Sequence, residues 1–384
     1  MTSVLVSSWA FSPWRDEAAT TAAARLLSDG ATRLDVVRAD LDDTRPREQP
    51  RPEVDDLIGR SISLPGHPVA PSTWAGIESY AAAAAGAVRA WQAAGVRWDG
   101  AYSGPAGLAD HLVLALLRER AVVPGWTAHL TDPPNHLASG RALTATVSPG
   151  PLRTACRALL DADPVSDFLG DWALAVVAAR ADRVVVATAA LGEHLLARAG
   201  AGSRDRLADR MEVWSRPACP VTAAPGGAGE SGDVRVTARV DRDRLAQLQP
   251  VLTAYGLLPE AARPRLHLLT NVPADVAVLL RESGLEGLVS LAPDLGPAAS
   301  AATAAAGDYA LVLDRPRPAG LPYALGDLPE IGDHAAYGTP VILLVPQDSP
   351  LTRLPVAHHV PDQHPSAVAA LFSRLAGAAV PARG

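Results

Sequence analysis

Two pairs of arginines follow β-branched runs in the second half of this chain and could bind a phosphate group. They are Arg242 and Arg244, after residues 234–240, and Arg315 and Arg317, after residues 309–314. A guanidinium group can bind a phosphate with two parallel hydrogen bonds. The chain contains no lysine, so any phosphate clamp must use arginine, backbone N–H groups or a helix N-terminus. The alternative is that both pairs belong to a solvated surface.

His129 and Asp132 lie at the end of another such run, residues 126–131. In an open parallel sheet, ligands bind outside the carboxyl ends of the strands, which is where these side chains would lie. A histidine can exchange a proton near neutral pH, so His129 is a candidate for proton transfer. The alternative is that residues 131–134 form only a turn and that His129 is a half-buried structural side chain.

Short β-branched runs alternate with longer helical patterns along the chain, which predicts βαβ units and parallel sheets. The expected strands are residues 4–9, 34–38, 98–103, 126–131, 184–188, 211–214, 234–240, 266–271, 288–292, 309–314 and 341–345. The clearest helices are expected at residues 16–28, 80–95, 107–120 and 366–376. Within 107–120 the spacing of apolar residues predicts one buried stripe, formed by Leu108, Leu112, Ala115 and Leu116.

The segment 218–233 is rich in Pro, Gly and Ser and has no hydrophobic period, so it is the best candidate for a linker. The predicted fold class is therefore α/β, with two Rossmann-like domains that face each other across a cleft. We expect an N-terminal domain at 1–217, a hinge at 218–233, a second domain at 234–365, and a closing helix and tail at 366–384.

Composition excludes several classes of protein. The net charge of −7 gives no electrostatic footprint for nucleic acid. Cys156 and Cys219 form neither a CxxC pair nor a zinc pattern, so a reducing cytoplasm is the expected location. The N-terminus has no signal-peptide pattern, and no window holds about 18 uninterrupted apolar residues as a transmembrane helix requires.

Four stretches, taken in order, resemble glycosyltransferases of the GT-B fold, in particular the family-4-like group of bacterial polysaccharide and natural-product pathways. The stretches are WDGAYSGPAGLADHLVLALLR at 98–118, VPGWTAHLTDPP at 123–134, ADRVVVATAALGEHLLAR at 181–198, and a run over 310–351 that contains LPEIGDHAAYGTPVILLVPQDSPL. Together they cover both expected domains in the order found in that family.

The resemblance implies transfer of a sugar from a nucleoside-diphosphate sugar, of the UDP or GDP type, to a small-molecule or lipid-linked acceptor. It implies that the N-terminal domain binds the acceptor and the C-terminal domain binds the nucleotide. It further implies retention of anomeric configuration, no divalent metal and no cofactor other than the sugar nucleotide.

Family motifs also suggest roles for individual residues. Asp333 matches the acidic residue that holds the ribose hydroxyls, because a carboxylate accepts two hydrogen bonds from a vicinal diol. The alternative is an exposed aspartate near a helix start. His129 and Asp132 correspond to the place beside the transferred sugar. His111 matches a histidine near the start of its helix, although a lone histidine on such a helix is more often structural.

The first loop, residues 8–17, departs from the family because it contains no glycine. Relatives have a Gly-Gly pair there, which lets the backbone approach the substrate. Here Trp9, Trp14 and Arg15 form a bulky, basic lip that could stack on an acceptor ring. The alternative is a plain strand-to-helix turn capped by Asp16.

The phosphate-binding motif also departs from the family. Glu330 stands where relatives have a lysine, and Leu325 stands where they have a second acidic residue. Either Arg242, Arg244, Arg315 or Arg317 compensates, or the chain is an inactive homologue that binds and stabilises a partner enzyme. A sugar-nucleotide epimerase on the same fold is a third reading. Either a homodimer or a complex with a partner enzyme fits these alternatives.

Overall fold

The computed structural model describes residues 2–14, 16–41, 52–65, 72–105, 107–120, 122–136, 140–161, 163–219, 234–294, 296–314, 317, 320–321, 325–326, 328–361 and 364–378. These residues form two compact units. The first holds the chain up to Arg216 together with Leu325 and Gly326, and the second holds the remainder from Pro217. Most of the predicted hinge, residues 220–233, lies outside the described residues.

The first unit is built on a parallel sheet of seven strands in the order β3-β2-β1-β4-β5-β6-β7. The strands are β1 (Ser3–Ser7), β2 (Arg33–Asp40), β3 (Ile58–Pro65), β4 (Gly100–Ser103), β5 (Trp126–Leu130), β6 (Arg183–Val186) and β7 (Met211–Val213). From β1 the chain adds β2 and β3 on one side of the sheet, and then returns to add β4 on the other side of β1. Such a switch point is where α/β sheets bind ligands, at the carboxyl ends of the strands.

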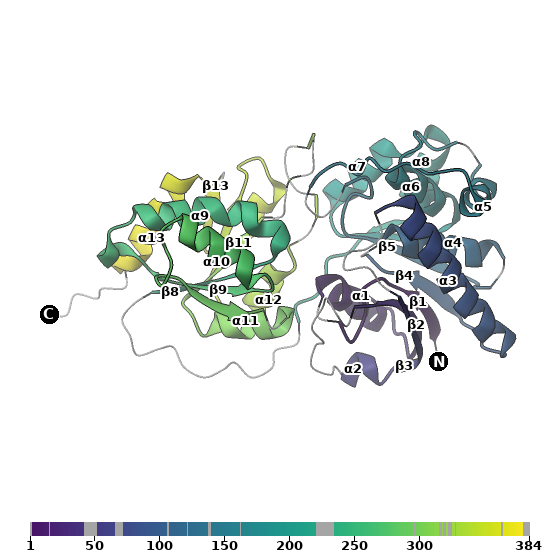
Figure 1. Cartoon of the computed structure of the whole chain (residues 1–384), viewed down its shortest axis with the longest axis horizontal. Helices are drawn as coiled ribbons and strands as arrows, with labels where there is room; N and C mark the ends of the chain where they lie inside the picture. Colours follow the sequence, from purple (N-terminus) through teal and green to yellow (C-terminus); the bar gives the residue numbers. More distant parts are fainter. Residues whose placement is uncertain are drawn as a thin grey trace. The chain divides into compact units, whose positions relative to one another are not determined.

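Helices cover both faces of this sheet (Figure 1). The helices are α1 (Glu17–Ser28), α2 (Pro52–Asp55), α3 (Trp74–Ala93), α4 (Leu108–Glu119), α5 (Pro151–Leu159), α6 (Leu169–Arg180), α7 (Ala189–Arg198) and α8 (Ala201–Arg210). On one face, α1 and α2 pack against Val6, Val36 and Tyr102. On the other face lies α4, which packs between α3 and α6.

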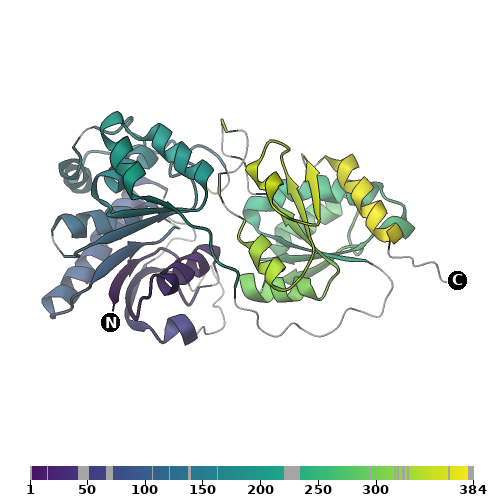
Figure 2. The same cartoon turned by 180° about the vertical axis from the view of Figure 1, so that it is seen from behind.

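The second unit has a parallel sheet of six strands in the order β10-β9-β8-β11-β12-β13. The strands are β8 (Arg235–Val240), β9 (Arg265–Thr270), β10 (Ser290–Pro293), β11 (Tyr309–Leu313), β12 (Val341–Val345) and β13 (His358–Pro361). The α-helices are α9 (Leu245–Leu257), α10 (Pro273–Glu282), α11 (Pro297–Ala305), α12 (Glu330–Ala336) and α13 (Pro365–Ala378), with 3-10 turns at Arg242–Arg244, Glu260–Ala262 and Pro350–Arg353. The reverse view in Figure 2 shows the helices on both faces of the sheet.

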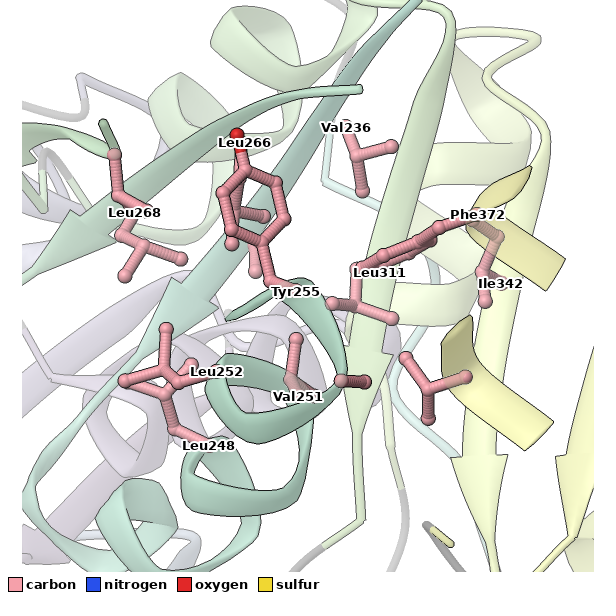
Figure 3. Packing of buried hydrophobic residues seen from close by; sticks show 14 of the residues in the cluster. Val236, Leu248, Val251, Leu252, Tyr255, Leu266, Leu268, Leu311, Ile342 and Phe372 are labelled. Atoms are coloured by element: carbon pink, nitrogen blue, oxygen red, sulfur yellow. The ribbon is translucent and has the colours of Figure 1, made fainter. Parts of the chain in front are cut away.

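The larger hydrophobic core of the second unit lies between its sheet and helices α9, α10 and α13 (Figure 3). Val236, Leu311 and Ile342 project from the strands onto Val251 of α9 and Phe372 of α13. A smaller cluster on the opposite face joins Ala304 of α11 to Val312, Leu343 and Leu328. Each unit is thus an independent three-layer α/β structure, and the predicted fold class of two Rossmann-like domains is confirmed.

The structure adds two edge strands that the sequence pattern did not predict, β3 and β13. In β3 only Leu64 is buried, and polar residues such as Arg60 and Ser61 interrupt the apolar pattern of its sequence. The His358–His359 dipeptide lies in β13 beside Ile342 and Leu343. Both segments pair on one side only, which explains why their sequences are less apolar than those of central strands.

Helix α4 is also more deeply buried than its predicted stripe implies. Leu112 and Ala115 are buried as expected, but Leu108 and Leu116 are only partly buried. Instead, polar Asp110 and His111 face the interior, because neighbouring helices and the sheet surround α4. A helix covered on several sides needs no single apolar stripe.

Candidate functional site

In the first unit, a buried carboxylate ties together three elements next to the carboxyl end of β1. Asp110 of α4 is completely buried. Its carboxylate accepts hydrogen bonds from the Ser7 hydroxyl (2.8 Å), the Trp9 backbone N–H (2.8 Å) and the Tyr80 hydroxyl (3.3 Å). Burial raises the pKa of Asp110 to about 7, although these three hydrogen bonds lower it. Asp110 was not among the residues predicted from the sequence.

His111, the next residue on α4, belongs to a neighbouring polar chain. Its Nδ1 atom lies 2.7 Å from the Ser103 hydroxyl, which also accepts a hydrogen bond from the Trp126 indole at 2.8 Å. Burial lowers the pKa of His111 to about 4, so its imidazole is neutral near pH 7. The structure therefore places His111 inside the unit, at the end of β4, and its predicted acceptor-side role remains a prediction.

His129 faces the opposite side of the sheet from Asp110 and His111. Its Nδ1 atom lies 2.6 Å from the Tyr102 hydroxyl, and its ring meets Trp214 edge-on at 5.5 Å. Burial, followed by the nearby charge of Arg25 on α1, lowers the pKa of His129 to about 3. The imidazole is thus a weak base at neutral pH.

Asp132, predicted to act with His129, is exposed, and its carboxylate accepts a hydrogen bond from the Thr131 hydroxyl at 3.1 Å. The structure shows no direct bond between the two residues among those it describes. Asp132 lies directly after β5 and is the more accessible of the pair.

The first loop folds inward. Trp9 and Trp14 are both buried, the Trp9 ring lies 5.3 Å from that of Tyr80, and the Trp14 indole donates to the Ala39 carbonyl at 3.0 Å. The predicted lip of exposed indoles is therefore wrong in its geometry, because both rings fill the interior. Arg15 lies outside the described residues. Asp16 caps α1 by accepting from the Ala18 N–H, as the alternative reading predicted.

Two histidines that the sequence analysis missed lie beyond β5 and on α7. The rings of His136 and His194 are 6.4 Å apart, and His194 Nε2 lies 3.4 Å from the Asn135 side-chain oxygen. Burial lowers the pKa of His194. Only the tertiary fold brings these residues together, since α7 follows the next strand of the sheet.

In the second unit, one of the four arginines predicted to bind phosphate, Arg244, forms an ion pair with Glu330. Arg244 lies 2.5 Å from Glu330, and both side chains are buried, with 7% and 8% exposure. Glu330 is the residue at the position where the resembling family has a lysine. Two opposite charges buried this close neutralise each other. Removing one of them would leave the other buried without a partner, which would lower the free energy of unfolding.

A second ion pair, in which Asp294 is buried and Arg239 is 17% exposed, was not predicted. Arg239 on β8 donates to the Asp294 carboxylate at 2.9 Å, and Asp294 also accepts from the Ser300 hydroxyl and the Gly296 N–H. Burial acts to raise the pKa of Asp294, but Arg239 and these hydrogen bonds outweigh it, so that its pKa is lowered. Arg239 was not recognised as a candidate from the sequence, because it is a charged residue inside a mostly apolar strand.

The remaining predicted arginines differ in exposure. Arg242 is 75% exposed and forms a 3.1 Å surface ion pair with Asp275. Arg317 is exposed, and Arg315 lies outside the described residues. A surface pair such as that of Arg242 contributes little and exchanges its partner easily.

Asp333 is almost completely buried on α12, and its carboxylate accepts the backbone N–H of Cys219 at 2.7 Å. Cys219 is near the start of the predicted linker. Beside it on α12, His334 is also buried, and desolvation lowers its pKa. Leu325, at the second position where relatives have an acid, is buried, and its carbonyl accepts the Thr188 hydroxyl at 2.5 Å.

Among the described residues, no group of three or more His, Cys, Asp or Glu side chains could hold a metal ion. None of the helices within those residues is both long and apolar enough to span a membrane.

The predicted site residues that the structure describes divide between the two units, and each set lies next to the carboxyl ends of the strands of its own sheet.

Comparison with solved structures identifies this architecture. A structure of HepE from Anabaena in complex with UDP and glucose aligns with a TM-score of 0.61 and 13% identity, over 97% of this chain and 89% of that one. The chain has the GT-B fold. Sucrose-phosphate synthase from Thermosynechococcus elongatus aligns with a TM-score of 0.60 and 16% identity, over 99% and 90% of the two chains.

The lipopolysaccharide outer core galactosyltransferase WaaB, in its apo form, aligns with a TM-score of 0.54 and 10% identity, over 97% and 89% of the two chains. No protein-family model and no curated protein matches the sequence. At such low identities the GT-B likeness concerns the fold, and function has to be argued from the site.

Proposed function

We propose that this chain is a glycosyltransferase that moves a sugar from a nucleoside-diphosphate sugar to a small-molecule or lipid-linked acceptor. The observation that carries the proposal is the agreement of both units, over nearly the whole chain, with GT-B structures described as a complex with UDP and glucose and as a galactosyltransferase. The polar residues at the carboxyl ends of both sheets support it, because these are the ligand-binding ends of such sheets.

In the proposed reaction, the bond between the anomeric carbon and the diphosphate oxygen breaks, and a bond to the acceptor oxygen forms on the same face of the sugar. The acceptor proton passes to the departing diphosphate, so no side-chain nucleophile and no metal ion are needed. The protein would act by positioning the two substrates and by stabilising the negative charge on the leaving group.

We assign the nucleotide side to Asp333, Arg242, Arg244, Arg315 and Arg317, and the acceptor side to Arg15, His111, His129 and Asp132. The exposed guanidinium of Arg242 is the cation best able to meet a diphosphate, because its ion pair with Asp275 is at the surface. On the acceptor side, Asp132 is the accessible carboxylate, whereas His129 and His111 are buried and neutral near pH 7.

One observation favours a second candidate function. The ion pairs Arg244–Glu330 and Arg239–Asp294 place carboxylates where a phosphate would otherwise meet these arginines. A chain whose cations are neutralised internally could serve as a non-catalytic GT-B subunit that binds or stabilises an active partner enzyme.

Titration calorimetry with UDP and with GDP tests the proposal. A nucleotide-sugar enzyme binds at least one of them, and Asp333→Asn weakens that binding at least tenfold because the amide no longer offers two acceptor oxygens to the ribose hydroxyls. Glu286→Gln is the control, because Glu286 pairs at the surface with Arg281, which has no assigned contact with the nucleotide, and this variant should leave the affinity within about twofold. Absence of binding to either nucleotide would reject the transferase and favour the subunit.

Asp333→Asn also has a structural cost that must be measured in parallel. Because the carboxylate is buried and bonded to the Cys219 N–H, the substitution should lower the free energy of unfolding by about 1–3 kcal/mol. A denaturant titration of the variant shows whether lost nucleotide binding reflects lost folding.

A further inference from the structure

The loop after β1 is held to β2 by backbone hydrogen bonds, from the Ser8 N–H to the Val37 carbonyl and from the Ala39 N–H to the Trp9 carbonyl, and to α4 by one side chain, that of Asp110. Within Ser8–Phe11, the Trp9 N–H donates to Asp110, and the preceding Ser7 donates its hydroxyl to the same carboxylate. Both distances are 2.8 Å. Asp110 is the only acidic residue of α4 before Glu119, and it lies in the first turn of this helix, which packs against β1.

Packing around the loop encloses this carboxylate. Tyr80 of α3 donates its hydroxyl to Asp110 from the other side, and its ring lies against that of Trp9 at 5.3 Å. Trp9 is 5% exposed and Asp110 is fully buried, so the indole and the tyrosine ring together cover the carboxyl group. Displacing Trp9 would remove one of the donors and admit water to the carboxyl at the same time.

We propose that Asp110 is a positioning residue that fixes the conformation of the loop Ser8–Phe11, and that this loop opens more readily when Asp110 is ionised. The inference rests on the proposed function in one respect, because that function places the loop beside the acceptor. The tether itself depends only on the hydrogen bonds and burial of the four residues Ser7, Trp9, Tyr80 and Asp110.

The difference in the pKa of Asp110 between the closed and the opened loop determines how pH changes the equilibrium of loop opening. Burial raises the pKa of Asp110 to about 7, whereas an opened loop would hydrate the carboxyl and return it toward its ordinary value of 3.8. Opening therefore releases a proton, and raising the pH from 6 to 8 favours it by about tenfold.

The two tyrosines and the histidine around this carboxyl do not titrate between pH 6 and 8. Tyr80 and Tyr102, from α3 and β4, have pKa values raised well above 10, and the pKa of His111 on α4 itself is lowered to about 4. Ser7 of β1 and the Trp9 N–H carry no charge. On α6, which also packs against α4, Asp171 is bound by Arg198.

Hydrogen exchange of the Trp9 backbone N–H, measured by NMR at pH 6 and pH 8 and corrected for the intrinsic exchange rate, tests the proposal on the full chain without any ligand. We expect its protection factor to fall about tenfold between these pH values in the natural sequence. In Asp110→Asn the protection factor should not change with pH, because the amide does not titrate and can still accept the Trp9 N–H.

Asp35→Asn is the matched control. Asp35 is an equally buried carboxylate of the same unit, but it bonds the Trp98 indole and Arg60 instead of the first loop. This variant should keep the tenfold change. Constant protection of the Trp9 N–H in the natural sequence, or a pH dependence that persists in Asp110→Asn, would overturn the proposal.

If Asp110→Asn does not fold, Tyr80→Phe provides the second test. Loss of one donor to the carboxylate should raise the pKa of Asp110 and move the midpoint of the protection change to higher pH. An unmoved midpoint would reject the tether. Since no nucleotide is present in these measurements, their failure is separate from failure of the calorimetric test of glycosyl transfer.

Discussion

At the scale of single residues, the ion pair of Arg244 and Glu330 decides how much positive charge the second unit can offer to a phosphate. Both side chains are buried, and their atoms approach to 2.5 Å. A phosphate that binds Arg244 would have to displace Glu330 or share the guanidinium with it. The carboxylate therefore competes with the substrate and repels it at the same time.

Glu330→Gln should raise the affinity for UDP or GDP about tenfold, because Arg244 then lacks its anionic partner and gains a charge-assisted bond to the diphosphate. The same change should lower the free energy of unfolding by about 1–3 kcal/mol, because it leaves a buried arginine without a countercharge. Calorimetry and denaturant titration measure the two effects.

Glu286→Gln is the matched control for this variant. Glu286 pairs with Arg281 at 3.6 Å, and both side chains are about two-thirds exposed. Its removal should change neither nucleotide affinity nor stability by more than about 0.5 kcal/mol. Equal nucleotide affinities in Glu330→Gln and the natural sequence would show that the buried pair does not compete with the diphosphate.

Asp110 gives a second prediction at this scale, on global stability. Its pKa is about 7 in the folded chain and 3.8 in an exposed carboxyl, so the folded state holds the proton more tightly. The stability that this group contributes is present at low pH and is lost as the pH rises from about 4 to 7. The loss amounts to at most about 4 kcal/mol.

Denaturant titrations at pH 5, 6, 7 and 8 measure this loss. The difference in unfolding free energy between Asp110→Asn and the natural sequence should shift in favour of the variant as pH rises. A difference that stays constant from pH 5 to 8 would mean that Asp110 has the same pKa in the folded and unfolded chains.

At the scale of elements, Gly104 lets the ends of β1 and β4 approach each other. A Cβ atom at this position would lie 2.1 Å from the Ser8 Oγ and 3.3 Å from the Ser8 Cα. The Gly104 N–H also donates to the Ser7 carbonyl at 2.8 Å. No side chain fits between the two backbones, so a glycine is required by close approach.

Gly104→Ala should therefore destabilise the chain by about 1–3 kcal/mol, because the added methyl group must displace the loop that carries Trp9. Gly100→Ala, at the start of β4, is the control, because a Cβ atom there meets nothing within 4 Å. Ser8→Gly removes the two closest contacting atoms and should restore most of the loss in the double variant. Thermal melting of the four proteins checks this, and a double variant no more stable than Gly104→Ala would contradict the steric explanation.

The strands that could be predicted from sequence carry apolar runs, whether they lie inside a sheet or, like β7 and β10, at its edge. The central strand β12 has the predicted bounds, residues 341–345, because all five of its side chains are buried and apolar. The edge strands β3 and β13 were missed, because polar residues such as Ser61 and His358 interrupt their apolar pattern. Propensity and periodicity describe a segment, whereas edge position is a property of the sheet.

The candidate site was less predictable for a related reason. The sequence located Arg244 and Glu330 separately, but their pairing depends on how α12 packs beside the turn that follows β8. Asp110 was not predicted, because its three hydrogen-bond donors come from β1, the first loop and α3, which lie far from it in the sequence. Contacts between distant segments decide whether a charged residue binds a ligand or another side chain.

At the scale of the whole molecule, the chain consists of two units, and among the described residues each of three hydrophobic clusters lies within one unit. The clusters around Val251 and Val312 contain residues of the second unit alone, and the cluster around Val36 contains residues of the first. Each parallel sheet is also complete within its own unit. Stability that arises from apolar burial therefore belongs to each unit separately.

This separation predicts that a fragment of residues 217–378 folds on its own, with a cooperative thermal transition, because both of its core clusters and all six of its strands are included. Circular dichroism and calorimetry measure the transition, and fragment 1–216 serves as the comparison for the first unit. If Asp333, Arg242 and Arg244 bind the nucleotide, the fragment 217–378 should bind UDP or GDP within about tenfold of the full chain, and fragment 1–216 should not. A folded second unit that binds neither nucleotide, while the full chain does, would place the main contacts to the nucleotide outside the residues proposed here.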